Sequence, residues 1–443
     1  MKYAMQLGLK GLRRHPRTML LAIVTMALGL AATMTMLTLL AMLSIDPLPG
    51  LSQNLYLGWV DSRQAAKVGD THYDGANGPP RLLKLTDVEA LAAAGPRARQ
   101  SALVATLMNV DSEDRSHQDS VRAVLATGPM PSMFGVPLQH GRYWTPQEER
   151  EHAPVAIIDR ATSLKLLGTA DGTGQRLHIG TSLFRVVGIS GEWNPQPHFY
   201  ALQEDEAAWG KNFAVRMFLP LQSALDAGVV PYSSQDCDRG DHGGFHFNEL
   251  DLKGCRFLQL WAELPTPGAI SDFQDMLDRY ARQRHAEGVF ARPAQASLYS
   301  VRQWLAANRT VPDSVHLNLW LAVGLLALCM VNVAGLLAAR FLRRSGELGI
   351  RRVLGAPRRA IIVQCLTEAS VAGLVGGLLA LPLTLFGLWV IRLQDHGYTD
   401  QARLNPLLFL ALLGLAVLVG LLVGLLPAWR ATRIEPALQV KSL

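Results

Sequence analysis

The chain has 443 residues, of which 49% are hydrophobic and only 18% are charged, and its formal net charge at pH 7 is +6. This composition argues against an ordinary soluble enzyme, because charged residues make up about a quarter of a typical soluble domain. The positive charge does not indicate nucleic-acid binding either, because residues 46–313 alone carry 25 Lys and Arg against 31 Asp and Glu.

The N-terminal segment predicts a membrane anchor. Residues 1–17 contain five basic residues, no acidic residue and several leucines, a pattern typical of a helix lying in the cytoplasmic interface. Residues 18–45 carry no charge and exceed the roughly 20 residues that a helix needs to cross a bilayer. The apolar run is about twice as long as that of a signal peptide. Residues 1–45 are therefore predicted to form an interfacial helix followed by the first transmembrane helix.

Residues 46–313 form a predicted domain that is long enough for a core of its own. Thr86 is a candidate N-cap for one of its helices. Gly- and Pro-rich segments at 74–80 and 190–197 predict surface loops. Hydrophobic periodicity predicts strands at 154–159 and 183–189 and amphipathic helices at 87–94 and 272–285. The class predicted for this domain is mixed α+β.

Residues 314–443 are dominated by three further apolar segments, at 314–339, 369–391 and 404–429. Each is longer than the roughly 20 residues of a membrane span. The three segments contain no Asp, Glu, Lys or Arg, and His316 is the only residue in them that could carry a positive charge. The predicted fold class is therefore a membrane protein with four transmembrane α-helices. A large α+β extracytoplasmic domain lies between the first and the second of them.

The distribution of basic residues predicts the topology. Residues 340–359 contain seven arginines against Glu347, whereas the short loop 392–403 has two arginines and two aspartates. The positive-inside bias places both termini and the arginine-rich loop in the cytoplasm. Residues 46–313 are then extracytoplasmic.

The four cysteines fall into two groups. Cys329 and Cys365 lie in or beside predicted spans, where cysteine is usually a packing residue. Cys237 and Cys255 lie in the outer domain, and in an oxidising compartment they are expected to form a disulfide. The alternative is a metal site formed by these two cysteines with Asp238, His242 and His246, but the three glycines in this segment disfavour the helix that His-x-x-x-His spacing requires. No metal site is predicted.

Two polar residues lie within the predicted spans. Glu368 follows the arginine-rich loop and lies in the third span. An acidic residue within a membrane span is a candidate functional residue, because burying its charge in the bilayer is costly. Its depth also allows pairing with a nearby arginine, and a structural role is the favoured interpretation. Asn332 in the second span is predicted to make an interhelical hydrogen bond rather than to bind a substrate.

The loop and third span, SGELGIRRVLGAPRRAIIVQCLTEASVAGLVGGLLALP, resemble the signature of the FtsX/MacB-type ABC transporter permeases. The tail LLPAWRATRIEPALQVKSL resembles the closing Pro-Ala-x-x-Ala-x-x-x-x-Pro pattern of the same family. In residues 46–313, LTDVEAL, FGVPLQHGRYWTPQEE, PVAIIDRATSLKLLG, LFRVVGI and FLPL occur in the order seen in MacB-like periplasmic core domains. The segment from Pro220 to Arg256 resembles no part of the family, and its role is open.

The resemblance implies three regions: 1–45, a MacB-like periplasmic core domain at 46–313, and an FtsX-like permease domain at 314–443 with a coupling loop at 340–360. A loop of this kind docks on the cytoplasmic ATPase, and the alternative is that its arginines only set the topology. Topology alone does not explain glycines in a short helix, where each costs about 1 kcal/mol. The residues expected to couple to the ATPase are Glu347, Leu348, Gly349, Ile350, Arg351, Arg352, Gly355 and Ala356.

The function implied by the resemblance is that of an ABC transporter permease of the mechanotransmission type in the bacterial inner membrane. No G-x-x-x-x-G-K-[ST] phosphate loop occurs, so no enzymatic activity and no cofactor are expected for this chain, with ATP and Mg²⁺ bound by a partner ATPase. A second permease copy, a periplasmic adaptor and an outer-membrane channel are the further partners implied. Export of peptides or antibiotics is favoured; lipoprotein release, and FtsX-like regulation of cell-wall hydrolases, are the alternatives.

Overall fold

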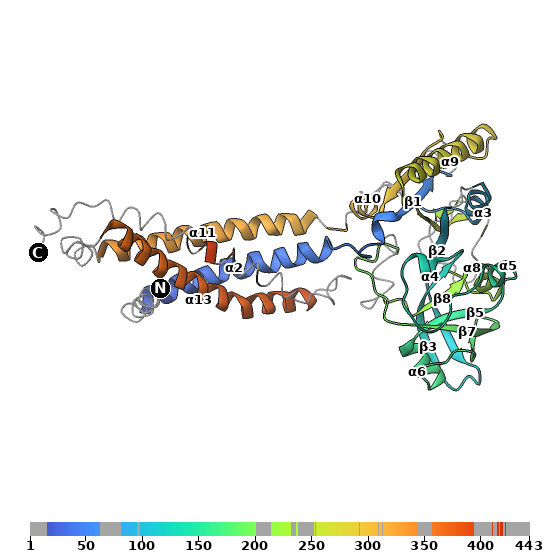
Figure 1. Cartoon of the computed structure of the whole chain (residues 1–443), viewed down its shortest axis with the longest axis horizontal. Coiled ribbons are helices and arrows are strands. Elements are labelled where there is room, and N and C mark those ends of the chain that lie inside the picture. Colours follow the sequence, from blue (N-terminus) through green and yellow to red (C-terminus); the bar gives the residue numbers. More distant parts are fainter. Residues whose placement is uncertain are drawn as a thin grey trace, which may run out of the picture. The chain divides into compact units, whose positions relative to one another are not determined.

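The computed structural model describes two units of the chain, a membrane unit of Met1–Ser44 with Val311–Leu443 and an outer domain of Ile45–Thr310 (Figure 1). The residues described are 16–62, 81–94, 98–200, 214–231, 236–237, 252, 254–291, 293–308, 310–311, 313–343, 357–393, 410, 414–415, 417–419 and 421.

The described part of the membrane unit contains three long apolar helices, α2 (Pro16–Leu43), α11 (Asp313–Arg343) and α13 (Arg358–Leu393). Each includes a segment long and apolar enough to cross a bilayer: Leu20–Leu43, Asp313–Ala339 and Gly373–Ile391. These segments match the first three predicted spans. The fourth, 404–429, lies mostly outside the described residues, as does the predicted interfacial helix.

Helix α2 is the central helix of the three that the structure describes. In its apolar segment 56% of the residues are buried, against 28% in the corresponding segments of α11 and α13. Leu30 and Met34 of α2 pack with Val333 of α11 and Ala380 of α13 in one cluster. Helices α11 and α13 therefore both pack directly against α2.

The outer domain is built on a mixed sheet whose described strands run in the order β12-β1-β11-β2-β3-β8-β5-β7-β4, with β6 pairing with β2 and β7. The pairs β3–β8 and β5–β7 are parallel and the other ladders are antiparallel. The strands are β1 (Leu55–Val60), β2 (Arg99–Ser112), β3 (Gln118–Ala126), β4 (Leu138–Gly141), β5 (Val155–Asp159), β6 (Arg176–Ile179), β7 (Ser182–Ser190), β8 (Met217–Pro220), β11 (Gln259–Glu263) and β12 (Ala296–Ser300).

Short helices surround the sheet, and one longer helix, α9 (Pro267–Ala286), packs beside β1 and β12 (Figure 1). The others are the 3₁₀ turn η1 (Ser52–Asn54), α3 (Leu85–Ala94), α4 (Met130–Met133), α5 (Pro146–Arg150), α6 (Arg160–Leu167), α8 (Leu221–Asp226) and α10 (Val301–Ala307). A separate two-stranded ladder joins β9 (Asp236–Cys237) to β10 (Cys255–Arg256).

The sheet has a core on each face, because successive side chains of a strand point to opposite sides. On β2, Ala102 and Val104 enter one core, with α3, α6 and α9, whereas Leu103 and Ala105 enter the other. The second is here called the aromatic core, and its large buried rings are Phe134, Trp144, Trp193, Phe199, Tyr200, Phe218, Trp261 and Trp304.

The predicted strands are confirmed as β5 and β7, and the predicted helices as α3 and α9, each with shifted starts. Helix α3 begins at Leu85, so Thr86 lies in its first turn and is not an N-cap. Helix α9 begins at Pro267, five residues before the predicted start, because Thr266 caps it by accepting a hydrogen bond from the N–H of Ala269.

Residues 191–197 form a loop, as predicted, but the prediction that this loop lies on the surface was wrong for most of it. Ser190 and Trp193 are buried, at 1% and 6% exposure, and Trp193 is part of the aromatic core. Its indole N–H donates to the carbonyl of Phe134 at 3.2 Å. Gly and Pro residues shape this segment, but its tryptophan anchors it inside the domain. The other predicted loop, 74–80, lies outside the described residues.

Candidate functional site

The eight predicted coupling residues, Glu347 to Ala356, lie outside the described residues. The helices that flank them are described: α11 ends at Arg343 and α13 begins at Arg358. Along the chain, these two helices are the elements to which the predicted coupling residues are directly joined. The packing of α11 and α13 on α2 therefore forms the first half of the candidate site.

Helix α2 meets α11 at a glycine. A Cβ on Gly29 would lie 3.1 Å from the Cα of Leu326 and 3.2 Å from both Cβ and Sγ of Cys329. One turn further along α2, the hydroxyl of Thr33 reaches the carbonyl of Gly29 at 2.9 Å and that of Ala322 on α11 at 3.2 Å. Close backbone approach next to an interhelical hydrogen bond is the usual way in which membrane helices hold their register.

Helix α2 meets α13 in the same manner, with the glycine on the partner. A Cβ on Gly387 would lie 2.8 Å from Oγ1 of Thr35, and one on Gly376 would touch Met26 at 3.5 Å. Between these contacts, the hydroxyl of Thr384 lies 3.8 Å from Sδ of Met34. Both neighbours of α2 are thus fitted closely to it.

The two predicted intramembrane polar residues differ in what the structure describes. Asn332 is exposed among the described residues of α11, so its predicted interhelical hydrogen bond stays a prediction. Glu368 belongs to α13, but its side chain lies outside the described residues.

The predicted disulfide has supporting backbone geometry. Cys237 and Cys255 are directly opposite each other in the antiparallel β9–β10 ladder. Cys255 is buried and disulfide-bonded, and its pairing with Cys237 stays a prediction. Cys329 is buried and carries a free thiol. His242 and His246 lie outside the described residues, and the part of the chain that is described contains no group of His, Cys, Asp and Glu that could hold a metal ion.

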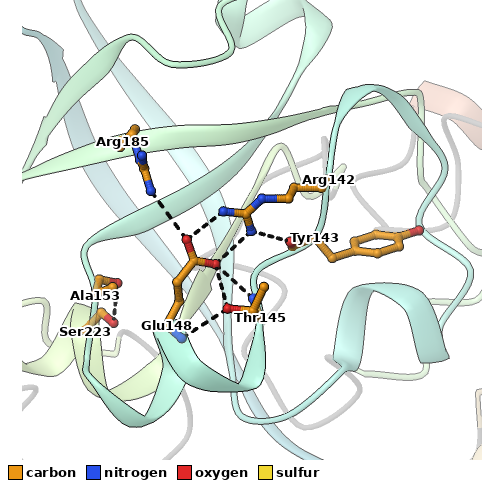
Figure 2. A network of polar contacts seen from close by, with 7 residues as sticks. All are labelled: Arg142, Tyr143, Thr145, Glu148, Ala153, Arg185 and Ser223. Atoms are coloured by element: carbon orange, nitrogen blue, oxygen red, sulfur yellow. Dashed lines mark hydrogen bonds and ion pairs between the residues drawn. The ribbon is translucent and has the colours of Figure 1, made fainter.

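A network of polar contacts centred on Glu148 fixes one end of the outer sheet (Figure 2). Arg142, directly after β4, binds the Glu148 carboxylate with both terminal nitrogens at 2.8 Å, and Arg185 of β7 approaches it at 3.4 Å. Thr145 and Glu148 form a capping box at the start of α5. The Arg142 bonds above all, with those of Thr145, lower the pKa of Glu148 from 4.5 to about 2.

The neighbouring residue of α5, Glu149, makes a different contact. Its carboxylate accepts a hydrogen bond from the N–H of Gly128 at 2.5 Å. Burial raises the pKa of Glu149 above its ordinary value. Gly128 itself has a φ of 64°, and a Cβ there would lie 2.4 Å from the carbonyl of Gln100. Helix α5 thus ties β4, β7 and the turn after β3 together.

The second half of the candidate site is the pair of segments by which the chain enters and leaves the outer domain. The first turns through Asp46, whose carboxylate accepts hydrogen bonds from the hydroxyl of Ser52 and the N–H of Leu48. The second is α10, which begins with a capping box of Ser300 and Gln303. Strands β1 and β12, which continue these segments, pair with each other, with Tyr56 opposite Ser300.

Sequence reasoning missed the Glu148 network and the aromatic core. The network did leave a signal, because Thr145-Pro146-Gln147-Glu148 is the S/T-x-x-E capping-box pattern with proline at the first helical position. The two arginines come from positions separated by more than forty residues, and no local pattern links them.

Two family descriptions match the chain. "MacB-like periplasmic core domain" matches residues 19–243, half of the chain, and "FtsX-like permease C-terminal" matches residues 320–436.

Curated relatives are similar at low identity. The "Macrolide export ATP-binding/permease protein MacB 2" of Aeromonas hydrophila subsp. hydrophila is 27% identical over 305 residues, which cover 68% of this chain and 40% of that protein. The "Pyoverdine export ATP-binding/permease protein PvdT" of Pseudomonas putida is 26% identical over 310 residues, with 69% and 40% covered. The chain thus spans about 40% of the length of these relatives.

Among solved structures, the periplasmic region of MacB from Actinobacillus actinomycetemcomitans aligns with a TM-score of 0.35 at 10% identity, covering 58% of this chain and 93% of that one. The extracellular domain of the ABC-type transporter YknZ from Gram-positive bacteria aligns with a TM-score of 0.34 at 11% identity, covering 55% and 100%.

Proposed function

Because the chain belongs to the family of ABC transporter permeases with a MacB-like periplasmic core domain and an FtsX-like permease C-terminal region, we propose that it works by mechanotransmission. In this scheme a cytoplasmic ATPase docks on the loop at 340–360. ATP-driven closure of the ATPase shifts α11 and α13, and the outer domain converts the shift into movement of periplasmic cargo.

One observation carries the proposal: the two segments that join the outer domain to α2 and α11 meet in a single ladder. Strand β1 follows α2 along the chain, β12 and α10 precede α11, and β1 and β12 pair over five residues from Tyr56 to Val60. Relative movement of two transmembrane helices would therefore act on adjacent strands. A sheet edge is stiff along its hydrogen-bonded strands, which suits it to receive such movement.

The proposed cargo is a periplasmic small molecule or peptide that is exported with the help of an adaptor and an outer-membrane channel. The names of the relatives, which refer to macrolide and pyoverdine export, support this cargo class. The proposed assembly contains two permease chains and two copies of the ATPase, which supplies the ATP and Mg²⁺ sites. The proposed topology in the bacterial inner membrane has both termini in the cytoplasm and residues 46–313 in the periplasm.

Affinity purification of the tagged chain from its native membrane, followed by mass spectrometry, tests this function. Recovery of an ABC ATPase together with a periplasmic adaptor is the expected result. An ATPase recovered with a cell-wall hydrolase or a lipoprotein carrier would move the function to regulation or to lipoprotein release. Absence of any ATPase from complexes that retain a second permease chain would contradict the proposal.

The docking role of the loop has its own test. Glu347→Lys reverses the charge of the only acidic residue in the loop, and Gly355→Trp adds bulk where close contact is proposed. Both should abolish stimulation of the ATPase by the permease while leaving the thermal stability of the outer domain unchanged. Arg343→Lys, which keeps the charge at the last residue of α11, is the matched control. Unchanged ATPase stimulation in both variants would rule out docking through this loop.

A further inference from the structure

Both segments that connect the outer domain to transmembrane helices end in the aromatic core. On the first segment, Leu48 and Leu55 are buried in this core. On the second, Val301 and Trp304 of α10 are buried in it, and Leu305 packs against it. In the proposed function, a movement of α2 or α11 would therefore be transmitted through these connecting segments to side chains of the aromatic core.

Trp304 is the most firmly held of these residues. Its side chain has no exposed surface, and its indole N–H donates to the carbonyl of Phe199 at 2.8 Å. The guanidinium of Arg81 lies 5.9 Å from the Trp304 ring and 4.9 Å from that of Tyr299, and it also donates to the Tyr299 hydroxyl at 3.0 Å. The indole bond is buried, and the contacts of half-buried Arg81 and Tyr299 act together with it to fix the orientation of the ring as well as its depth.

The last turn of α10 is stabilised by hydrogen bonds from two side chains that follow it. The side chain of Asn308 donates to the carbonyl of Trp304 at 2.8 Å, and the hydroxyl of Thr310 donates to that of Leu305 at 3.0 Å. Carbonyls in the last turn of a helix are otherwise free to bind water, and the turn then frays. These two hydrogen bonds satisfy carbonyls in the last turn of α10 and so stabilise that turn.

Trp304 bonds not to the sheet but to the segment that follows β7. This segment, residues 191–200, is here called the output segment. It has a second anchor in Trp193, whose ring packs edge-on against Phe218 of β8 at 5.5 Å between centroids. Between the anchors, the side chain of His198 lies within 2.8 Å of Asn194 Oδ1 and 2.5 Å of Gln196 Nε2. Burial lowers the pKa of His198 to about 3, so its imidazole is neutral at physiological pH.

We infer that Trp304 is a positioning residue that links α10 to the output segment through Phe199, so that movement of α10 displaces residues 191–200. The inference rests on the proposed function, and it assigns to one indole N–H the step between α10 and the segment that follows β7. The contrary view is that Trp304 only fills the aromatic core. The two views differ in what the loss of one hydrogen bond does.

Trp144 provides the matched control. Its indole N–H also donates to a backbone carbonyl, that of Gly128 at 3.1 Å, and its ring belongs to the same core. It lies between β4 and α5 along the chain and belongs to neither connecting segment. Trp304→Phe and Trp144→Phe therefore remove the same kind of bond, and a purely structural role predicts similar losses of thermal stability and no further difference.

The experiment measures the distance between two spin labels in the full chain, reconstituted in nanodiscs with its co-purified ATPase. Labels are placed at the exposed positions Glu192 of the output segment and Ser120 of β3, in a background with Cys329 and Cys365 replaced by alanine. The distance is compared between the nucleotide-free state and the state trapped with ATP and vanadate.

The unsubstituted chain is expected to show an ATP-dependent change of distance, Trp144→Phe to retain it, and Trp304→Phe to reduce it to less than one third while ATP hydrolysis continues. A change that persists in Trp304→Phe would overturn the role of Trp304 and leave the proposed function standing. No change in the unsubstituted chain, despite ATP hydrolysis, would overturn mechanotransmission and the inference together. Should Trp304→Phe fail to fold, Arg81→Gln is the second variant, because it removes the guanidinium that orients the Trp304 ring toward Phe199. It is expected to reduce the change by half or more, and an unaltered change would again overturn the inference.

Discussion

Gly29 of α2 and Cys329 of α11 lie so close that a Cβ on Gly29 would stand 3.2 Å from the cysteine sulfur. Cys329 carries a free, buried thiol. A disulfide requires its two Cβ atoms to be about 3.5–4.5 Å apart, so only a slight adjustment of the helices is needed. The contact therefore offers a covalent test of how α2 and α11 move.

Gly29→Cys is expected to form a disulfide with Cys329 under mild oxidation, because the two positions face each other across the helix contact. Cleavage of the chain within the outer domain and non-reducing electrophoresis should show α2 still linked to α11. Leu28→Cys is the matched control, since Leu28 is the neighbour of Gly29 on α2 and its side chain is 50% exposed. Equal linkage in both variants would contradict the described contact.

Thr33→Val should weaken the membrane unit by about 0.5–1 kcal/mol, because it removes the hydroxyl that reaches Ala322 on α11 and keeps the shape of the side chain. Thr35→Val, whose hydroxyl bonds to Ala31 within α2, provides the comparison. Unfolding titrations of the full chain in mixed micelles measure the difference. A larger loss in Thr35→Val would show that the interhelical bond contributes nothing.

Glu148→Gln should destabilise the outer domain by about 1–2 kcal/mol at pH 7, since the charge-assisted bonds to half-exposed Arg142 are lost. The depressed pKa of Glu148 gives stability that is present above pH 4.5 and is lost as the pH falls toward 2. The deficit of the variant should therefore shrink between pH 5 and pH 2. Denaturant unfolding followed by tryptophan fluorescence across this range is the measurement.

Glu149→Gln should behave in the opposite way. Burial raises the pKa of Glu149, so its ionised form costs stability at pH 7, and the glutamine oxygen can still accept from the Gly128 N–H. The variant is expected to be as stable as the unsubstituted chain or slightly more stable at neutral pH, with the difference vanishing in acid. Parallel titration of both variants gives the sign, and a loss as large as that of Glu148→Gln would contradict the assigned environments.

Cys255→Ser should lower the stability of the outer domain by roughly 3 kcal/mol, the value expected for opening a loop of this length. Cys237→Ser should have the same effect if these two cysteines are partners, and the double variant should lose no more than either single one. Thermal unfolding measures the losses, and alkylation with and without reductant, read by mass spectrometry, identifies the bonded cysteines. A free Cys237 thiol before reduction would refute the pairing.

Periodicity predicted the elements that depend on local sequence. The three described spans, β5, β7, α3 and α9 follow from uninterrupted apolar runs or from amphipathic spacing. Their starts were less predictable, because a cap depends on a single hydrogen bond: Thr266 provides it for α9, whereas Thr86 does not for α3.

The candidate site was predictable only in part. The coupling loop is predicted from the sequence alone, and it stays a prediction because its eight proposed coupling residues lie outside the described part of the chain. The roles of Trp193 and Trp304 could not be predicted, because both indoles bond to backbone carbonyls, of Phe134 and Phe199. Every residue carries a backbone carbonyl, so the sequence does not indicate which one a buried indole will reach. Only the fold brings these particular ones to the rings.

The pairing of β1 also determines when the outer domain can finish folding. Strand β1 lies near the start of the outer domain, yet both of its neighbours, β11 and β12, come from the end of the domain. Until Gln259 has been translocated, β1 has unpaired backbone groups on both sides, and an apolar strand in that state invites wrong pairing. In the proposed topology, β1 therefore stays unpaired for most of the time that the domain is being translocated. We expect correct folding of the domain to depend on periplasmic chaperones that bind such unpaired strands.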